Sequence, residues 1–287
     1  MRAMGPSVTA WAAASHRAAH QLLEDGRIFA DPLAVPMLGL SAAEVAAAAS
    51  ADPARRGMRL FIAARTRFAE DALARAVANG ASQLVVLGAG LDTFAYRNPF
   101  AGRLRVFEVD HPATQDWKRR RLAESGIAVP DSLVFAPVDF ETTTLADGLA
   151  AAGFDAGRRS FFTWLGVVPY LTEAAIFATL AYVACLPGGA EIVFDYADPP
   201  GTLAPARRAK HAARAARVAA LGEAWLSYFE AADLRARLLE LGFSEVEDLG
   251  PPEIYARYFR LSSGAPDRGG HFVRALVAGR SHARLVG

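Results

Sequence analysis

Residues 84–93 read Leu-Val-Val-Leu-Gly-Ala-Gly-Leu-Asp-Thr, and this stretch decides the fold. Four apolar residues in a row are typical of a short strand buried on both faces of a parallel sheet. Gly88, Ala89 and Gly90 follow directly, and glycines after the first strand let backbone amides approach a nucleotide-like ligand. The pattern indicates a cofactor at this turn, although two glycines also occur in turns that bind nothing.

The same stretch argues against a dinucleotide. A dinucleotide fingerprint has a third glycine at the position of Thr93, where it lets a helix pack closely against the strand beneath a pyrophosphate. Neither Lys118 nor Lys210 has a tyrosine four residues before it, so the Tyr-x-x-x-Lys pair of many dehydrogenases is missing. There is no P-loop and no Gly-x-Ser-x-Gly elbow either. We therefore expect a cofactor without a pyrophosphate.

Apolar runs and helical stretches alternate after this turn, which predicts an α/β fold with a doubly wound parallel sheet. Expected strands are 84–87, 104–109, 133–138, 161–168 and 192–194, with helices at about 112–125, 143–152 and 173–186. The C-terminal part adds an amphipathic helix that stops at Gly242, and strands near 244–249 and 272–277.

The residues before the first strand read as a helical cap. Asp31-Pro32 predicts a helix N-cap followed by proline in the first turn, and Ser41 and Glu44 have the spacing of a capping box. A long helix with Leu60 and Phe68 on its apolar face should end near Asn79-Gly80.

We predict one domain over residues 1–287, because no repeat or long linker divides the chain. Its expected parts are a helical cap (1 to about 80), a cofactor-binding core (81–200), a helical insertion (201–230) and a C-terminal helix with strands (231–287).

Composition narrows the class of function. The chain has 287 residues, 31 basic and 30 acidic side chains, and a net charge of +1. The overall charge therefore does not favour binding to nucleic acid or to a membrane surface. Cys185 is the only cysteine, which excludes disulfides and cysteine-cluster metal sites and favours the cytoplasm. His16 and His20 lack a nearby metal-site pattern, so we expect no metal and interpret the pair as a surface feature. No apolar stretch has the length of a membrane span.

Acidic side chains stand where successive strands end. Glu108 and Asp110 lie about twenty residues after the glycine turn, where a carboxylate accepts hydrogen bonds from ribose hydroxyls. Asp139 and Phe140 end the next strand and suit an adenine, with the carboxylate at its amine and the ring over its face. The alternative is that Asp110 or His111 only caps the following helix.

An adenosine ligand without a pyrophosphate, in a chain without a metal pattern, indicates S-adenosylmethionine. Its methionine carboxylate needs a cationic partner, and Arg65 or Arg67, shortly before the sheet, could supply bidentate hydrogen bonds. Either arginine could equally belong to an exposed helix face.

Six blocks of the chain resemble the leucine carboxyl methyltransferase family of class I S-adenosylmethionine-dependent methyltransferases, especially its bacterial branch. They are residues 64–68, 84–93, 107–112, 138–140, 164–172 and 193–196, in the family's order.

The resemblance implies a Rossmann-like seven-stranded sheet with an N-terminal helical cap and a helical insertion over the substrate side. It implies that Arg65 binds the methionine carboxylate, that the 88–90 turn passes beneath the cofactor, and that Asp110 holds the ribose. It further places Asp139 and Phe140 at the adenine, and we add Trp164, from the fifth block, to the expected cofactor site. Two positions depart from the family: Phe94, where many members have arginine, and Leu165, where members that methylate protein C-termini have glutamate.

We expect an O-methyltransferase that acts on a carboxylate or a phenol of a small natural product. His111 and Tyr170, at strand-end positions, are the candidates to orient or deprotonate the acceptor, with a helix cap and a cleft wall as their alternatives. The basic segment 201–222 leaves an RNA methyltransferase open, although it lacks interleaved aromatic residues. A third alternative is a cofactor-binding protein without transferase activity.

Overall fold

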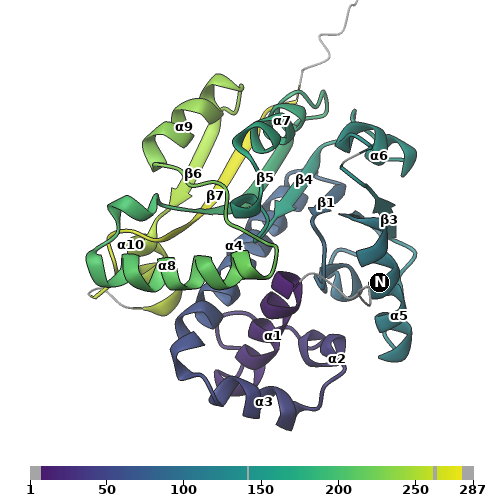
Figure 1. The fold of residues 1–287 in the computed structure, drawn as a ribbon. Helices are drawn as coiled ribbons and strands as arrows, with labels where there is room; N and C mark the ends of the chain where they lie inside the picture. The colour runs from purple at the N-terminus through teal and green to yellow at the C-terminus, as the bar shows by residue number, and fades with distance from the viewer. Residues whose placement is uncertain (1–7, 141, 261–263, 280–287) are drawn as a thin grey trace, which may run out of the picture.

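The computed structural model describes residues 8–140, 142–260 and 264–279, which form helices around one central sheet (Figure 1). The strands are β1 Gln83–Leu87, β2 Arg105–Asp110, β3 Leu133–Pro137, β4 Ser160–Trp164, β5 Ala190–Ala197, β6 Glu245–Leu249 and β7 Gly270–Val277. The α-helices are α1 Val8–Leu23, α2 Ala34–Leu38, α3 Ala42–Ser50, α4 Arg56–Ala78, α5 Pro112–Glu124, α6 Leu145–Ala151, α7 Glu173–Ala184, α8 Pro205–Ala220, α9 Ala231–Glu240 and α10 Pro251–Ile254. Shorter helical segments are η1 Pro53–Arg55, η2 Phe94–Arg97, η3 Val168–Tyr170, η4 Pro200–Thr202 and the π-helical turn η5 Tyr255–Phe259.

The seven strands form one mixed sheet in the order β3-β2-β1-β4-β5-β7-β6. The first five pair in parallel, and β7 runs antiparallel to both β5 and β6. The expected α/β doubly wound, seven-stranded methyltransferase-type fold is confirmed. Because the strand order reverses direction between β1 and β4, the carboxyl ends of these two strands open the crevice where ligands of such sheets bind.

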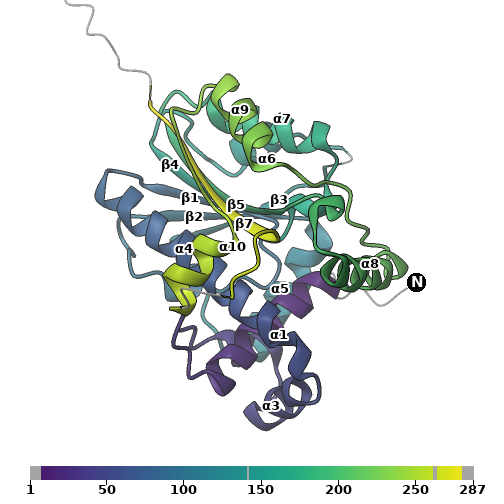
Figure 2. The same ribbon diagram turned by 90° about the vertical axis from the view of Figure 1, so that its left-hand side faces the viewer.

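Helices cover both faces of the sheet (Figure 2). Helices α6, α7 and α9 pack on one face through apolar side chains that include Leu149, Leu180 and Leu238, all fully buried. Helix α4 covers the other face, where Phe68 and Phe272 are buried together with ring centroids 5.8 Å apart. Since β1 is buried along its whole length, its run of apolar residues is explained by these two layers.

Helices α1, α2 and α3 form a separate apolar cluster at one end of the sheet, at the bottom of Figure 1. The capping box of α3 is present, with Ser41 accepting from the Glu44 amide and Glu44 accepting from the Ser41 amide. The expected cap at Asp31 is wrong: α2 begins at Ala34, and its N-cap is Leu33. The Asp31 carboxylate is buried instead, and it accepts a hydrogen bond from the Thr93 hydroxyl at 2.7 Å.

The expected helical insertion is confirmed as α8, which crosses near the start of α1 in both views (Figures 1 and 2). The 223–229 segment that follows α8 is hydrogen-bonded to η3, the turn after β4. The Leu226 amide donates to the Pro169 carbonyl at 2.7 Å, and the Ser227 hydroxyl donates to the Val168 carbonyl at 2.9 Å. Within the described ranges, no helix combines the length and the apolar character needed to cross a membrane.

Candidate active site

The glycine turn after β1 has the backbone geometry that the sequence predicts. Gly88 has φ +63° and Gly90 has φ +43°, a left-handed region that favours glycine. A Cβ on Gly88 would lie 2.6 Å from a Val167 methyl group in the loop after β4. The Gly90 amide donates to the Asp110 carboxylate at 2.6 Å, so the turn is tied to the end of β2.

The two carboxylates of β2 have different surroundings. Asp110 is partly exposed at the sheet edge, and its second oxygen accepts from the His111 amide at 2.7 Å. Glu108 has no exposed surface; it accepts from the Lys118 ammonium at 2.7 Å and from the Tyr96 hydroxyl at 3.3 Å. Burial raises the pKa of Glu108 to about 7 against the opposing effect of Lys118. Of the two, only Asp110 presents a carboxylate to a ligand at this edge.

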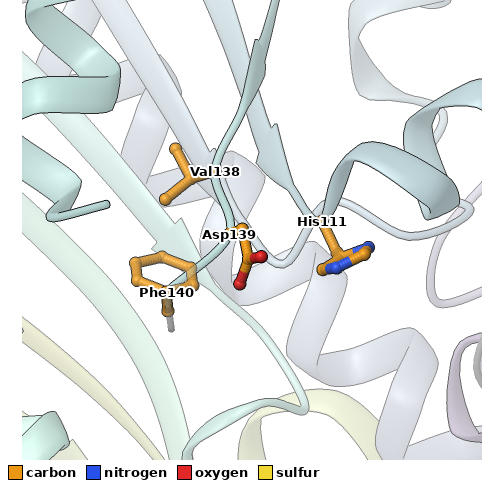
Figure 3. A pocket seen from close by; sticks show the side chains of 4 residues that line it. All are labelled: His111, Val138, Asp139 and Phe140. Carbon is orange, nitrogen blue, oxygen red and sulfur yellow. The ribbon is translucent and has the colours of Figure 1, made fainter. Parts of the chain in front are cut away.

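A cavity of about 380 Å³ lies beside the ends of β2 and β3, lined by His111, Val138, Asp139 and Phe140 (Figure 3). Phe140 is 62% exposed, a large apolar ring that the protein itself leaves uncovered. The structure thus brings together the two side chains expected at an adenine, and it places the His111 imidazole in the same cavity. His111 Nδ1 accepts from the Ala113 amide at 3.2 Å, so the cap alternative for this residue is confirmed.

Arg65 lies in α4 with its guanidinium at the carboxyl ends of β4 and β5. It donates to the Asp195 carboxylate at 2.9 Å, and the other Asp195 oxygen accepts from the Gly166 amide at 2.6 Å. The Arg65 side chain is 8% exposed, and its Nε has no hydrogen-bond partner among the described residues. A buried donor without a partner is costly, so this guanidinium is suited to an additional anionic group.

The loop after β4 connects these parts of the site. Val167 lies against Gly88, and Gly166 lies against Arg65, where a Cβ would be 2.7 Å from Nη1. The glycine turn and the arginine therefore face the same short loop at the switch point of the sheet. S-adenosylmethionine needs backbone amides, a partly exposed carboxylate, an uncovered aromatic ring and an arginine with a donor to spare, and the residues present fit it.

Two other candidate residues for the cofactor differ from Arg65 in their surroundings. Arg67 faces solvent on α4 and donates to Asp71 at 2.8 Å, so it does not share the position of Arg65. Trp164 is 3% exposed and packs edge-on against Phe194 in the core, with ring centroids 6.5 Å apart. Trp164 therefore packs in the core at the end of β4, next to the loop that contacts the glycine turn.

The histidine pair in α1 is not a surface feature, which corrects the expectation. His20 is fully buried; its ring is 3.2 Å from the Glu24 carboxylate and accepts from the Ile28 amide at 3.3 Å. His16 is partly buried, and burial lowers its pKa to about 4, with Arg214 adding to the effect. The sequence spacing showed a shared helix face and carried no signal of what that face packs against.

Tyr170 ends η3, after β4, and lies apart from His111, which follows β2. Burial raises the pKa of the Tyr170 phenol, and the nearby Glu223 carboxylate adds to the shift, whereas a hydrogen bond with Trp225 and the charges of Arg214 and Arg65 oppose it. The phenol therefore stays protonated at neutral pH and acts as a hydrogen-bond group rather than as a base.

Sequence reasoning missed Asp195 and the contacts of the insertion. Asp195 lies in the family-like block 193–196, and nothing local in the sequence links it to Arg65, 130 positions earlier. Glu223 accepts from the Val8 and Thr9 amides, which ties the start of α1 to the end of the insertion. These pairings join segments distant in the chain, so no sequence spacing could have shown them.

The fold and the site together define the class: a Rossmann-like α/β protein of the methyltransferase type, with a cofactor edge suited to S-adenosylmethionine. Residues 10–184 match the family model described as leucine carboxyl methyltransferase. The chain belongs to the leucine carboxyl methyltransferase family.

Relatives agree with this assignment. The chain is 39% identical over 204 residues to YktD of Bacillus subtilis, a protein named as an S-adenosyl-L-methionine-dependent methyltransferase, with 68% of this chain and 65% of YktD covered. It is 34% identical over 184 residues to a similarly named protein of Saccharopolyspora erythraea, with 61% and 63% covered. The matched region thus spans slightly less than two thirds of each relative.

Among solved structures, magnesium protoporphyrin IX methyltransferase from Synechocystis PCC 6803 is similar with a TM-score of 0.47 and 13% identity. The similarity covers 77% of this chain and 86% of that one.

Proposed function

We propose that the protein is an S-adenosylmethionine-dependent O-methyltransferase that acts on a carboxylate or a phenol of a small molecule. The observation that carries the proposal is the convergence on the loop after β4, where Val167 contacts the Gly88 turn and Gly166 contacts Arg65. Family membership and relatives named as S-adenosylmethionine-dependent methyltransferases support the cofactor. The single cysteine favours action in the cytoplasm.

Each part of the cofactor has a partner in this chain. Arg65 would hold the methionine carboxylate, and the Gly88–Gly90 turn would pass beneath the cofactor. Asp110 would accept from the ribose hydroxyls, while Asp139 and Phe140 would hold the adenine. Glu108 and Trp164 support this edge from the interior, since neither presents an exposed polar group to it.

The cofactor supplies an electrophilic methyl group on a sulfonium, and the protein supplies alignment and a dry environment. Well-oriented approach contributes about 7–11 kcal/mol to such displacements. A carboxylate acceptor is ionised at neutral pH and needs no base, whereas a phenol with a pKa of about 10 would gain from one. The protonated Tyr170 hydroxyl is suited to orient an acceptor oxygen, and His111 belongs to the adenosine side of the edge.

The proposal does not extend to RNA. The basic insertion directs two of its arginines at the protein itself: Arg207 donates to the Arg268 carbonyl, and Arg214 lies over the Trp225 ring. Two of the five basic side chains of α8 therefore contact the protein itself, which favours a small-molecule acceptor over RNA.

Calorimetric titration with S-adenosylmethionine and with NAD tests the cofactor. Binding of S-adenosylmethionine with no measurable binding of NAD is the expected result, and the reverse would overturn the proposal. Transfer of a labelled methyl group in a cell extract, followed by mass spectrometry, would then identify the acceptor. Label found only in RNA would contradict the small-molecule class, and no transfer to any component would favour a cofactor-binding protein without transferase activity.

A further inference from the structure

One arginine of the insertion has no ionic partner among the described residues. Arg214, near the middle of α8, is partly buried, and no carboxylate of the described residues is paired with its guanidinium. The guanidinium carbon lies 5.4 Å from the centroid of the Trp225 ring, a cation–π contact. Burial lowers the pKa of Arg214, and repulsion from Arg217 and Arg55 adds to the effect. This cation is partly desolvated and uncompensated.

An aromatic wall lies beside this arginine. The His211 ring centroid is 5.1 Å from that of Trp225 and 5.5 Å from that of Tyr228. The Leu226 amide, next to Trp225, donates to the carbonyl of Pro169, next to Tyr170, so the aromatic wall adjoins η3. The pKa of the Tyr170 phenol responds to the charges of both Arg214 and Arg65, the arginine assigned to the methionine end of the cofactor.

The helical cap supplies further positive charge to this group. The charges of Arg214 in α8, Arg55 in η1 and Arg59 in α4 all act on His16 of α1. Burial lowers the pKa of His16 to about 4; these three arginines add to the effect, and Asp52 opposes it. Arg59 is paired with Glu24 and Arg55 with Asp52, so Arg214 is the uncompensated charge of the group.

The surrounding elements are held in place. Glu223 accepts from the Val8 and Thr9 amides at 3.2 and 3.1 Å, which fixes the end of the insertion to the start of α1. Backbone hydrogen bonds from the Leu226 and Ser227 amides to the Pro169 carbonyl fix the same segment to η3. The helix that carries Arg214 is therefore held in place by its connections to α1 and to η3.

We propose that Arg214, with His16, Tyr170 and Trp225 around it, binds an anionic group of the methyl acceptor, a carboxylate or a phosphate. We call these four residues the Arg214 cluster. An anion would complete the charge-assisted hydrogen bonds that the guanidinium lacks in the protein alone. The Trp225 ring would pack against the apolar part of the same molecule. This inference rests on the proposed function, since it places the acceptor beside Tyr170 and Arg65.

Binding of simple probes to the full chain tests the site, with S-adenosylhomocysteine present and absent. Benzoate and phenyl phosphate are the two anionic probes, and benzyl alcohol is their neutral counterpart. We expect at least one anion to bind measurably and the alcohol to bind at least about tenfold more weakly. The preferred anion distinguishes a carboxylate from a phosphate. Equal binding of the alcohol, or no binding of either anion, would overturn the inference.

Two variants of the same helix provide the control. Arg214→Gln should weaken anion binding about tenfold or more, whereas Arg208→Gln, which removes an exposed charge from another face of α8, should change it less than about twofold. Since α8 has no buried residue, both variants are expected to keep the fold, which circular dichroism would verify. Equal effects of the two substitutions would show general electrostatic attraction and contradict the site.

His16 offers a readout independent of turnover. An anion bound at Arg214 should raise the pKa of His16, seen by NMR titration of its ring, because it offsets the repulsion from Arg214, Arg55 and Arg59. In Arg214→Gln, the probe should produce no such shift, and a shift of the same size would refute the proposed position. Probe binding without S-adenosylmethionine binding would instead refute the proposed function and leave the anion site standing.

Discussion

Asp195 determines the orientation of Arg65, the residue we place at the methionine carboxylate. Its two carboxylate oxygens accept from Arg65 Nη1 and from the Gly166 amide, so one side chain fixes both the guanidinium and the loop after β4. The pair leaves Arg65 Nε without a partner among the described residues. In the proposed site, Asp195 is a positioning residue, and Arg65 would be the group that meets the ligand.

Arg65→Gln should weaken S-adenosylmethionine binding by about 1.5–3 kcal/mol, or about tenfold to a hundredfold, through loss of charge-assisted hydrogen bonds. Isothermal titration measures the change. Arg67→Gln, on the same helix but exposed and paired with Asp71, should bind the cofactor like the natural chain. Similar losses in both variants would contradict the role of Arg65.

Gly88→Ala tests the glycine turn. A non-glycine residue at φ +63° costs about 1–2 kcal/mol, and its Cβ would be 2.6 Å from a Val167 methyl group. We expect a lower melting temperature and weaker cofactor binding. Adding Val167→Ala should restore part of the stability by relieving the contact but not the backbone strain. A double variant no more stable than Gly88→Ala would contradict the steric explanation.

At the scale of elements, the insertion and the first helix behave as one unit. The 223–229 segment joins α8 both to α1, through Glu223, and to η3, through Leu226 and Ser227. The cap and the insertion therefore border the same region from two sides. Mobility in one should pass to the other.

Glu223→Gln should loosen the first turn of α1, because a neutral amide interacts less strongly with the exposed amides of a helix start. The expected loss is about 0.5–2 kcal/mol, as for other lost caps, with faster hydrogen exchange confined to the start of α1 and the 223–229 segment. Glu240→Gln, at an exposed helix end, serves as the control. Unchanged exchange in Glu223→Gln would show that this contact does not couple the two elements.

At the scale of the whole molecule, a network of polar side chains connects β5, β6 and β7, the antiparallel part of the sheet. His271 of β7 lies 2.8 Å from the Asp248 carboxylate of β6 and 3.2 Å from that of Asp198, which follows β5. The Tyr196 hydroxyl donates to Asp248 at 2.6 Å. Burial opposes the protonated imidazole, but the two carboxylates outweigh it and raise the pKa of His271.

This network makes stability depend on pH. Because the folded pKa of His271 is above its unfolded value of about 6.5, its contribution is complete below that pH and declines as the pH rises through the folded pKa. Asp248→Asn removes one of the charges and should flatten this decline, as measured by urea unfolding between pH 6 and 9. A slope identical to that of the natural chain would refute the assignment.

Several elements could be predicted from the sequence because their signals are local. The apolar run of β1, the capping box at Ser41 and the stop of α4 before Gly80 depend on residues within a few positions of one another. The positions of Asp110, Asp139 and Phe140 at one sheet edge followed from the rule that parallel strands end on the same side. Strand 161–168 was predicted too long, since β4 ends at Trp164 and the chain turns at Gly166 with φ +74°.

Other features needed the tertiary structure. Asp31 has the sequence signature of a helix N-cap, yet its carboxylate is buried and accepts a hydrogen bond from the Thr93 hydroxyl. The reason is that the N-terminal helices pack against the glycine turn. The antiparallel direction of β7, the ion pair of Arg65 with Asp195, and the inward position of Arg214 all join segments far apart in the chain.

The sequence by itself determined the parallel core, the glycine turn and the cofactor edge, because these depend on local periodicity and on strand-end geometry. Only the tertiary structure decided which charges are satisfied. It paired Glu108 with Lys118 in the interior. Among the residues that the structure describes, it left Arg65 Nε without a partner and placed Arg214 beside Trp225 without a carboxylate. The physical reason is that the state of a charge depends on its neighbours in space and its exposure to water, and long-range packing sets both.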